Sequence, residues 1–299
     1  MTPHKPDAKT VAFERARPRL RGVAYRMLGS VADADDAVQD VYLKWQKIDF
    51  SEIENPEAWL VTACTRRSID MLRAAHKTRV DYVGTWLPEP VIGDTPLDVG
   101  EQAELASSLT MAFLLLLERL GPVERAAYLL REVFGYTYKD VAFAIGRNEA
   151  ACRQIVSRAK KCLENQKVSD PPAPQRREGL LNAFMDALHS GETQHLTKLL
   201  ADDVELRGDG GGKVIATLNV IRTPQSVAKF LAGVWQKAWR NLDIEGTTVN
   251  GNPGAILRDG DTVYATLSLT ADGAGQCSRI DIMRNPEKLG HIGGPKHQI

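Results

Sequence analysis

The sequence predicts a multidomain protein in which two all-α domains are followed by an α+β domain. Residues 13 to about 80 and residues 101–164 carry apolar side chains at helical spacing, whereas the chain beyond residue 200 alternates apolar and polar side chains. Two stretches rich in proline or glycine, residues 84–100 and 169–175, separate these patterns. We therefore expect domains at 10–80, 101–165 and 176–299, with linkers at 81–100 and 166–175.

The composition favours a protein without a disulfide framework or a metal. Its 299 residues balance 38 Lys and Arg against 38 Asp and Glu, so net charge indicates no partner. The four cysteines lie far apart, with no C-x-x-C pair and no zinc-ligand spacing. The start of the chain lacks an apolar leader, and the longest apolar run, residues 112–117, is too short to span a bilayer. We expect a cytoplasmic protein with no membrane contact and no cofactor.

The first helical domain combines an acidic helix with a basic one. Along residues 30–48 the positions Ala34, Ala37, Val38, Val41 and Trp45 form an apolar stripe, which leaves Asp36, Gln39 and Asp40 facing outward. A new helix after Pro56 places Arg66, Asp70, Arg73 and Lys77 on one face, flanked by Arg67. This basic face, beside a loop that contains Asn55, is suited to gripping a DNA backbone.

Residues 135–163 predict two short helices joined by a tight turn. Thr137 and Asp140 suit the start of the first helix, Gly146 its left-handed end, and Asn148 the start of the second. The second helix has an apolar stripe and a polar face composed of Arg153, Gln154, Ser157, Arg158, Lys160 and Lys161. Such a helix fits the major groove of DNA, where Arg and Gln bond base edges and lysines bond phosphates. The alternative is a helical hairpin with a merely solvated basic face.

The motifs "DADDAVQDVYLKW", "NPEAWLVTACTRRSIDMLR" and the helix-turn-helix, in this order, resemble regions 2 and 4 of the extracytoplasmic-function sigma factors, which are small bacterial sigma-70 relatives. The resemblance implies a factor that directs RNA polymerase to promoters and is not an enzyme. It assigns contacts with core RNA polymerase to Asp36, Gln39 and Asp40. It assigns the promoter −10 strand to Asn55, Trp59, Arg66, Arg67, Asp70 and Arg73. It assigns the −35 element to Arg153, Gln154, Ser157, Arg158 and Lys160.

The linker "YVGTWLPEP", together with "DGGGK" at 209–213 and "NPEKL" at 285–289, resembles signatures of the SigJ-related subgroup. Members of that subgroup carry a fused SnoaL-like domain, a cone-shaped barrel of curved strands closed by helices. Aromatic side chains are costly to leave in water, so we expect the linker to dock on this domain and the contact to regulate the factor. The residues expected to make it are Trp86, Leu87, Pro88, Asp209, Gly210, Gly211, Gly212, Lys213, Asn285, Pro286, Lys288 and Leu289.

The third domain shows few signs of catalysis. "GDGGGKV" lacks the spacer and the Ser or Thr of a phosphate loop, which favours a glycine-rich turn between strands. We expect strands in "DVELRG", "KVIATLNVI", "TVYATLSLT" and "SRIDIMR". No catalytic set emerges from His189, His195, Asp202 and Asp203. A small-molecule site would be lined by Phe184, Phe230, Trp235, Trp239 and Tyr264, although aromatics at helical spacing more often form plain core.

Two other functions remain open at this point. A helix-turn-helix repressor or activator with a ligand-sensing domain would bind duplex DNA without polymerase, usually as a dimer. A SnoaL-type isomerase or hydrolase tethered to DNA would turn over a small substrate. Neither explains the acidic helix of residues 33–40. The sequence leaves open the promoter, the inducing signal, the oligomeric state, and whether the third domain activates or inhibits.

Overall fold

The computed structural model describes residues 7–79, 82–93, 108–164 and 174–293. The chain divides into two compact units. The helical unit comprises residues 1–80, 95–109 and 113–167, so the two expected helical domains pack together as one. The sheet unit comprises residues 81–94, 110–112 and 168–299, and it therefore includes the linker. None of the helices within the described ranges has both the length and the apolarity needed to cross a bilayer.

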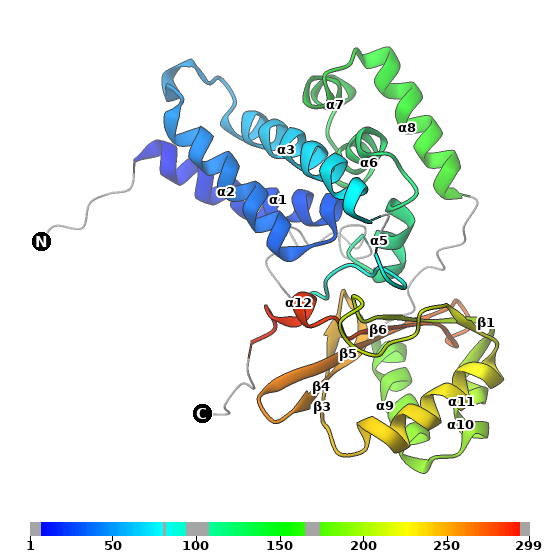
Figure 1. Ribbon diagram of the computed structural model, residues 1–299. Coiled ribbons are helices and arrows are strands. Elements are labelled where there is room, and N and C mark those ends of the chain that lie inside the picture. Colours follow the sequence, from blue (N-terminus) through cyan, green and yellow to red (C-terminus); the bar gives the residue numbers. More distant parts are fainter. Residues whose placement is uncertain (1–6, 80–81, 94–107, 165–173, 294–299) are drawn as a thin grey trace, which may run out of the picture. The chain divides into compact units, whose positions relative to one another are not determined.

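The first half of the helical unit is built from three long helices (Figure 1). They are α1 (Ala8–Leu28), α2 (Val31–Lys47) and α3 (Pro56–Arg79), with a short 3₁₀ turn, η1 (Phe50–Glu52), before α3. Gly29 ends α1 in the left-handed conformation, and Ser30 caps α2. All five residues of the predicted apolar stripe on α2 are buried. The predicted break before Pro56 is confirmed.

The second half of the helical unit contains the predicted helix-turn-helix. Its elements are α5 (Met111–Leu117), α6 (Pro122–Tyr128), the π-helical turn η2 (Leu129–Val133), α7 (Tyr138–Ile145) and α8 (Glu149–Glu164). Thr137 and Asp140 cap α7 reciprocally, and Gly146 ends it with φ 67°. The side chain of Asn148 accepts a hydrogen bond from the backbone of Ala151 at 2.8 Å. The predicted stripe on α8 is buried at Cys152, Ile155, Val156, Ala159 and Leu163.

The sheet unit is an α+β domain with six strands in the order β2-β1-β6-β5-β4-β3. The strands are β1 (Leu200–Asp209), β2 (Ile221–Arg222), β3 (Asp243–Val249), β4 (Asn252–Asp259), β5 (Thr262–Ala271) and β6 (Cys277–Met283). Strands β1 and β6 are parallel, and the other neighbours are antiparallel.

Helices of the sheet unit cover one face of this sheet (Figure 1). They are α9 (Pro174–Ser190), α10 (Thr193–Leu199) and α11 (Pro224–Val234), the last continued by the π-helical turn η3 (Trp235–Trp239). The short helix α12 (Pro286–Leu289) follows β6. Phe184 and Leu231 from the helices pack against Leu206, Leu267 and Ile280 from the strands in one hydrophobic core.

"KVIATLNVI" was expected as a strand, but only its last residue pairs, within β2. A turn closed on the Gly210 carbonyl folds the chain back, and Ile215 and Leu218 stay exposed, so the apolar alternation has no face to bury. The aromatic candidates for a ligand cavity are core residues instead: Phe184 and Trp239 are buried, and Phe230, Trp235 and Tyr264 pack against the same core. The ring of His189 packs on Trp235.

Candidate nucleic-acid interface and linker-binding site

The polar face of α8 is presented to solvent as predicted. Arg153, Gln154, Ser157 and Arg158 are exposed. Arg153 is held by an i,i+4 ion pair with Glu149 at 3.0 Å, and its guanidinium lies 5.0 Å from the Tyr138 ring centroid. These contacts orient the guanidinium without burying it, which leaves the face able to enter a groove.

Lys160 differs from its neighbours on α8 because it reaches back to the preceding turn η2. Its ammonium pairs with Glu132 at 2.7 Å, and this hydrogen bond raises the pKa of Lys160. The side chain must leave Glu132 before it can bind a phosphate, so it is less available than the sequence suggested.

The residues assigned to the −10 strand have structural partners in the helical unit. Asn55 caps α3, with its side chain accepting from the Ala58 backbone at 3.0 Å. Trp59 is half-buried against Trp45, with ring centroids 5.4 Å apart. Arg67 pairs with Asp40 at 2.6 Å, and thereby joins a residue assigned to DNA with one assigned to polymerase.

Arginine-to-carbonyl hydrogen bonds join the two halves of the helical unit. Arg66 on α3 donates to the carbonyls of Phe143 and Ala144 at 2.7 and 3.1 Å, in the last turn of α7, where helix carbonyls lack intrahelical donors. Arg125, which is buried, donates to the Met27 carbonyl at 2.7 Å. The guanidinium of Arg66 is therefore bonded to α7, whereas Asp70 and Arg73 form an exposed pair with each other.

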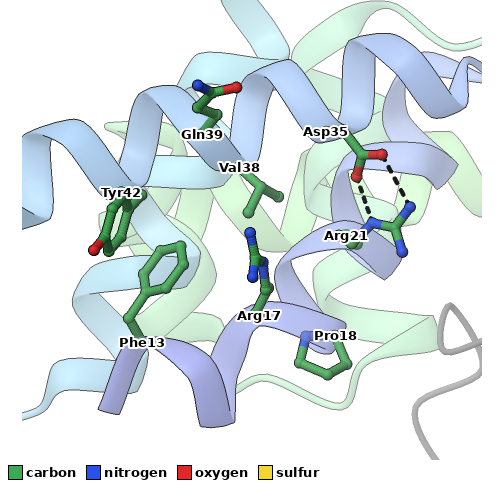
Figure 2. A pocket seen from close by; sticks show the side chains of 8 residues that line it. All are labelled: Phe13, Arg17, Pro18, Arg21, Asp35, Val38, Gln39 and Tyr42. Atoms are coloured by element: carbon green, nitrogen blue, oxygen red, sulfur yellow. Dashed lines mark hydrogen bonds and ion pairs between the residues drawn. The ribbon is translucent and has the colours of Figure 1, made fainter. Parts of the chain in front are cut away.

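A groove of about 730 Å³ lies between α1 and α2 (Figure 2). Its lining includes Gln39, one of the three residues assigned to polymerase, and Asp36 is exposed on the same helix. Apolar side chains form part of the lining, and Arg21, paired with Asp35, lies at its polar part. The residues of the groove are Phe13, Arg17, Pro18, Arg21, Asp35, Val38, Gln39 and Tyr42.

In the sheet unit, one buried carboxylate gathers three segments that are distant in sequence. Asp209 ends β1 with 0% of its surface exposed. Its Oδ1 accepts from the Tyr82 hydroxyl at 2.6 Å and from the Gly211 backbone at 2.9 Å. Its Oδ2 accepts from the Leu87 backbone at 2.9 Å and from the Lys288 ammonium at 2.8 Å. Four donors therefore compensate the desolvation of this charge.

Linker and α12 also contact one another directly. The Lys288 ammonium donates to the Leu87 carbonyl at 2.6 Å and lies 4.4 Å and 5.0 Å from the ring centroids of Trp86 and Tyr82. The Asn285 side chain donates to the Tyr82 hydroxyl at 3.0 Å. Burial, followed by the hydrogen bond to Asp209, raises the pKa of Tyr82 well above its usual range.

The glycines of "DGGGK" are required by close approach. A Cβ on Gly211, which has φ +61°, would lie 2.3 Å from the Asn285 side chain. A Cβ on Gly210 would lie 2.4 Å from the Val214 carbonyl. Lys213 forms an ion pair with Glu287 on α12. The three signatures therefore meet at one place, with Leu87, Pro88 and Leu289 buried and Pro286 exposed at the start of α12.

The linker continues along the sheet unit through contacts that the sequence did not reveal. Val91 exchanges hydrogen bonds with Asn250 at 3.2 and 2.7 Å, and Ile92 pairs with Val249. His291 contacts the Pro90 carbonyl at 2.8 Å. The "NGN" turn at 250–252 signals a hairpin, but no local pattern shows that it receives a segment 159 residues away.

Within the described ranges, no three His, Cys, Asp or Glu side chains come together as metal ligands. Cys64, Cys152, Cys162 and Cys277 are free thiols. Burial raises the pKa of both Cys64 and Cys277 to about 12, which makes them inert packing residues.

Two helical regions, the second a helix-turn-helix with an exposed basic face, match the family models of sigma-70 proteins. Sigma-70 region 2 matches residues 12–78, and sigma-70 region 4 matches residues 110–163. The chain is 38% identical to the ECF RNA polymerase sigma factor SigJ of Mycobacterium tuberculosis H37Rv, over 93% of this chain and 92% of that protein. It is 25% identical to the probable ECF RNA polymerase sigma factor SigI of M. tuberculosis CDC 1551, over 95% of each.

The crystal structure of M. tuberculosis SigJ superposes with a TM-score of 0.74 at 30% identity, covering 94% of this chain and 98% of that one. The chain belongs to the ECF RNA polymerase sigma factors. The predicted family and fold class are thereby confirmed, and the likeness extends through the C-terminal domain.

Proposed function

We propose that this sigma factor directs core RNA polymerase to its promoters through three separate surfaces of the helical unit, and that the sheet unit regulates it by binding the linker. The observation that carries the regulatory part is the buried cluster around Asp209, which ties linker residues Tyr82 and Leu87 to β1 and α12.

Promoter reading is assigned to α8 and α3. Arg153 and Gln154 are exposed near the start of α8, where a recognition helix places the side chains that bond base edges. Arg66, Arg67 and Arg73 on α3 suit the phosphates of an unwound strand. Binding there requires Arg66 to exchange the α7 carbonyls for phosphate.

Polymerase docking is assigned to α2. Asp36 and Gln39 are exposed on this helix, beside the groove between α1 and α2 (Figure 2). An exposed acidic helix next to a partly apolar groove has the features of a protein interface, with a polar rim around an apolar centre.

Regulation follows from the position of the linker along the chain. The linker lies in sequence between the two DNA-binding regions, so a domain that captures it restrains how far those regions separate. The contact is intramolecular, which gives it a high effective concentration even where each interaction is weak. The chain then distributes between a captured and a released linker, and polymerase and promoter favour whichever state fits them.

Run-off transcription with purified core polymerase tests this function. The full chain is compared with Trp86→Ala and with chains ending after residue 165 or before Asn285. We expect promoter-specific transcripts from the full chain, a changed yield in all three variants, and faster proteolysis of the linker in Trp86→Ala. Unchanged yield and unchanged proteolysis would remove the regulatory role. Binding of a duplex operator without any association with polymerase would instead support a repressor or activator.

A further inference from the structure

The ammonium of Lys288 sits in a complete recognition site for a primary amine. Two of its N–H groups have oxygen acceptors, the Leu87 carbonyl at 2.6 Å and Asp209 Oδ2 at 2.8 Å. The faces of Trp86 and Tyr82 lie 4.4 and 5.0 Å away, within the range of cation–π attraction. An anion, a carbonyl and two aromatic rings are the groups with which proteins bind alkylammonium ligands.

The walls of this site and its occupant come from different segments. Tyr82, Trp86 and Leu87 belong to the linker and Asp209 to β1, whereas Lys288 arrives on α12, a helix of four residues. We name these four wall residues the ammonium cage. Three other donors hold its carboxylate in place, namely the Tyr82 hydroxyl and the Gly211 and Leu87 backbones. The cage therefore keeps its geometry without depending on Lys288 for every contact.

We propose that the ammonium cage is a binding site for a small primary alkylammonium ion, which replaces Lys288 and removes its contact between α12 and the linker. This inference rests on the proposed regulatory role of the linker contact and names the ligand that would act on it. A primary ammonium satisfies both oxygen acceptors, whereas a quaternary ammonium has no N–H to donate and a neutral alcohol brings no charge. The edge of the site reaches solvent, because Tyr82 and Trp86 are only half-buried and the Lys288 side chain is 11% exposed.

Replacement by a free amine leaves part of the linker contact intact. The hydrogen bonds from Tyr82 and Leu87 to Asp209 do not involve Lys288, so the linker stays on β1. The contacts of Asn285 with Tyr82 and of His291 with Pro90 also remain, so α12 is loosened by the loss of the Lys288 contact and is not released. In the unaltered chain the tethered Lys288 competes at an effective concentration of millimolar or above, so free amine acts most strongly where Lys288 is absent.

Chemical rescue of full-length Lys288→Ala tests the cage. The atoms removed by this substitution correspond to n-propylammonium, which is added as its chloride at constant ionic strength. The readout is chymotryptic cleavage after Tyr82, a site that every variant retains. We expect Lys288→Ala to be cut at least about tenfold faster than the unaltered chain, since it leaves a buried carboxylate without its cation, and propylammonium to slow cleavage again. 1-Propanol and tetramethylammonium should have little effect.

The double variant Lys288→Ala, Trp86→Ala is the matched control, because it removes one wall of the cage. Rescue that persists in this variant, rescue by 1-propanol to the same extent, or no rescue at all would overturn the proposal. Should Lys288→Ala lack a cooperative unfolding transition, amide exchange of the unaltered chain decides instead. Propylammonium should then speed exchange at residues 286–293 and leave residues 82–87 unchanged, and no change at 286–293 would overturn the proposal.

Transcription separates this inference from the proposed function. Amine rescue of cleavage without any effect of Lys288→Ala on transcript yield supports the cage and rejects regulation by the linker contact. A changed yield without amine rescue retains the regulation and rejects the cage.

Discussion

The ion pairs on α8 and around Asp209 are built from the same kinds of groups, but they contribute very different amounts to the stability of the fold. Arg153 and Glu149 are 56% and 45% exposed, and such a pair contributes about 0–1 kcal/mol because water and salt screen it. Lys288 and Asp209 are 11% and 0% exposed, and removing one member of a buried pair typically costs about 3–5 kcal/mol. The comparison teaches that α8 keeps its charges available for exchange with DNA, whereas the Asp209 cluster uses its charges to fix the path of the chain.

Asp209→Asn tests the buried Lys288–Asp209 pair most directly. The amide leaves the Lys288 ammonium without its anion and places NH₂ donors against the donors of Tyr82 or Leu87. We expect the sheet unit to lose about 3–5 kcal/mol of unfolding free energy, measured by urea denaturation of the full chain. Asp261→Asn, in the exposed turn between β4 and β5, is the control and should change it by less than about 0.5 kcal/mol. Equal effects of the two would show that Asp209 does not organise the cluster.

Gly211→Ala perturbs the same cluster without changing its charge. Alanine at φ +61° is strained by about 1–2 kcal/mol, and its Cβ forces Asn285 away at a further cost of about 1–3 kcal/mol. We therefore expect a loss of about 2–5 kcal/mol in the same denaturation experiment. Gly273→Ala is the matched control because its Cβ would meet open space. A neutral Gly211→Ala would mean that Asn285 and the turn separate easily.

Arg153→Ala tests the exposed side of the comparison. Its stability should change by less than about 1 kcal/mol, while binding of polymerase holoenzyme to a matched −35 element should weaken by about 1–3 kcal/mol relative to a mismatched one. Lys161→Ala, on the same helix, should weaken binding equally on both sequences, since a phosphate contact carries no base information. Equal losses for Arg153→Ala on the two sequences would reject its role in base reading.

Local patterns predicted most of the helical unit and only part of the sheet unit. The caps at Thr137 and Gly146 and the stripe on α2 are set by residues a few positions apart, so the sequence shows them directly. The β4 strand escaped notice because almost all of it is buried, and it therefore lacks alternation. The expectation that the linker, "DGGGK" and "NPEKL" meet came from family resemblance. In the structure the contact is made by the side chains of Tyr82, Asp209 and Lys288.

The partners of arginines were the least predictable feature of the site. Nothing near Arg66 in the sequence indicates that it bonds α7 carbonyls, because that contact depends on how two regions nearly eighty residues apart pack. A basic helical face shows which side chains can bind phosphate. It does not show which of them already have a carbonyl or a carboxylate as partner.

Tyr82→Phe should have the smallest effect, and that effect should depend on pH. The folded chain raises the pKa of Tyr82 above the value of about 10 in an unfolded chain, so folding favours the protonated phenol. Below pH 10 this contribution is fully present, and above pH 10 the unfolded chain releases the proton first, so stability falls as pH rises. The slope is at most about 1.4 kcal/mol per pH unit, and less here because Tyr82 is half-buried. In denaturation curves from pH 8 to pH 10.5, the stability gap between the unaltered chain and Tyr82→Phe should stay constant up to about pH 9.5 and shrink beyond it. A gap that is constant throughout would show that the hydroxyl is not held against the Asp209 carboxylate.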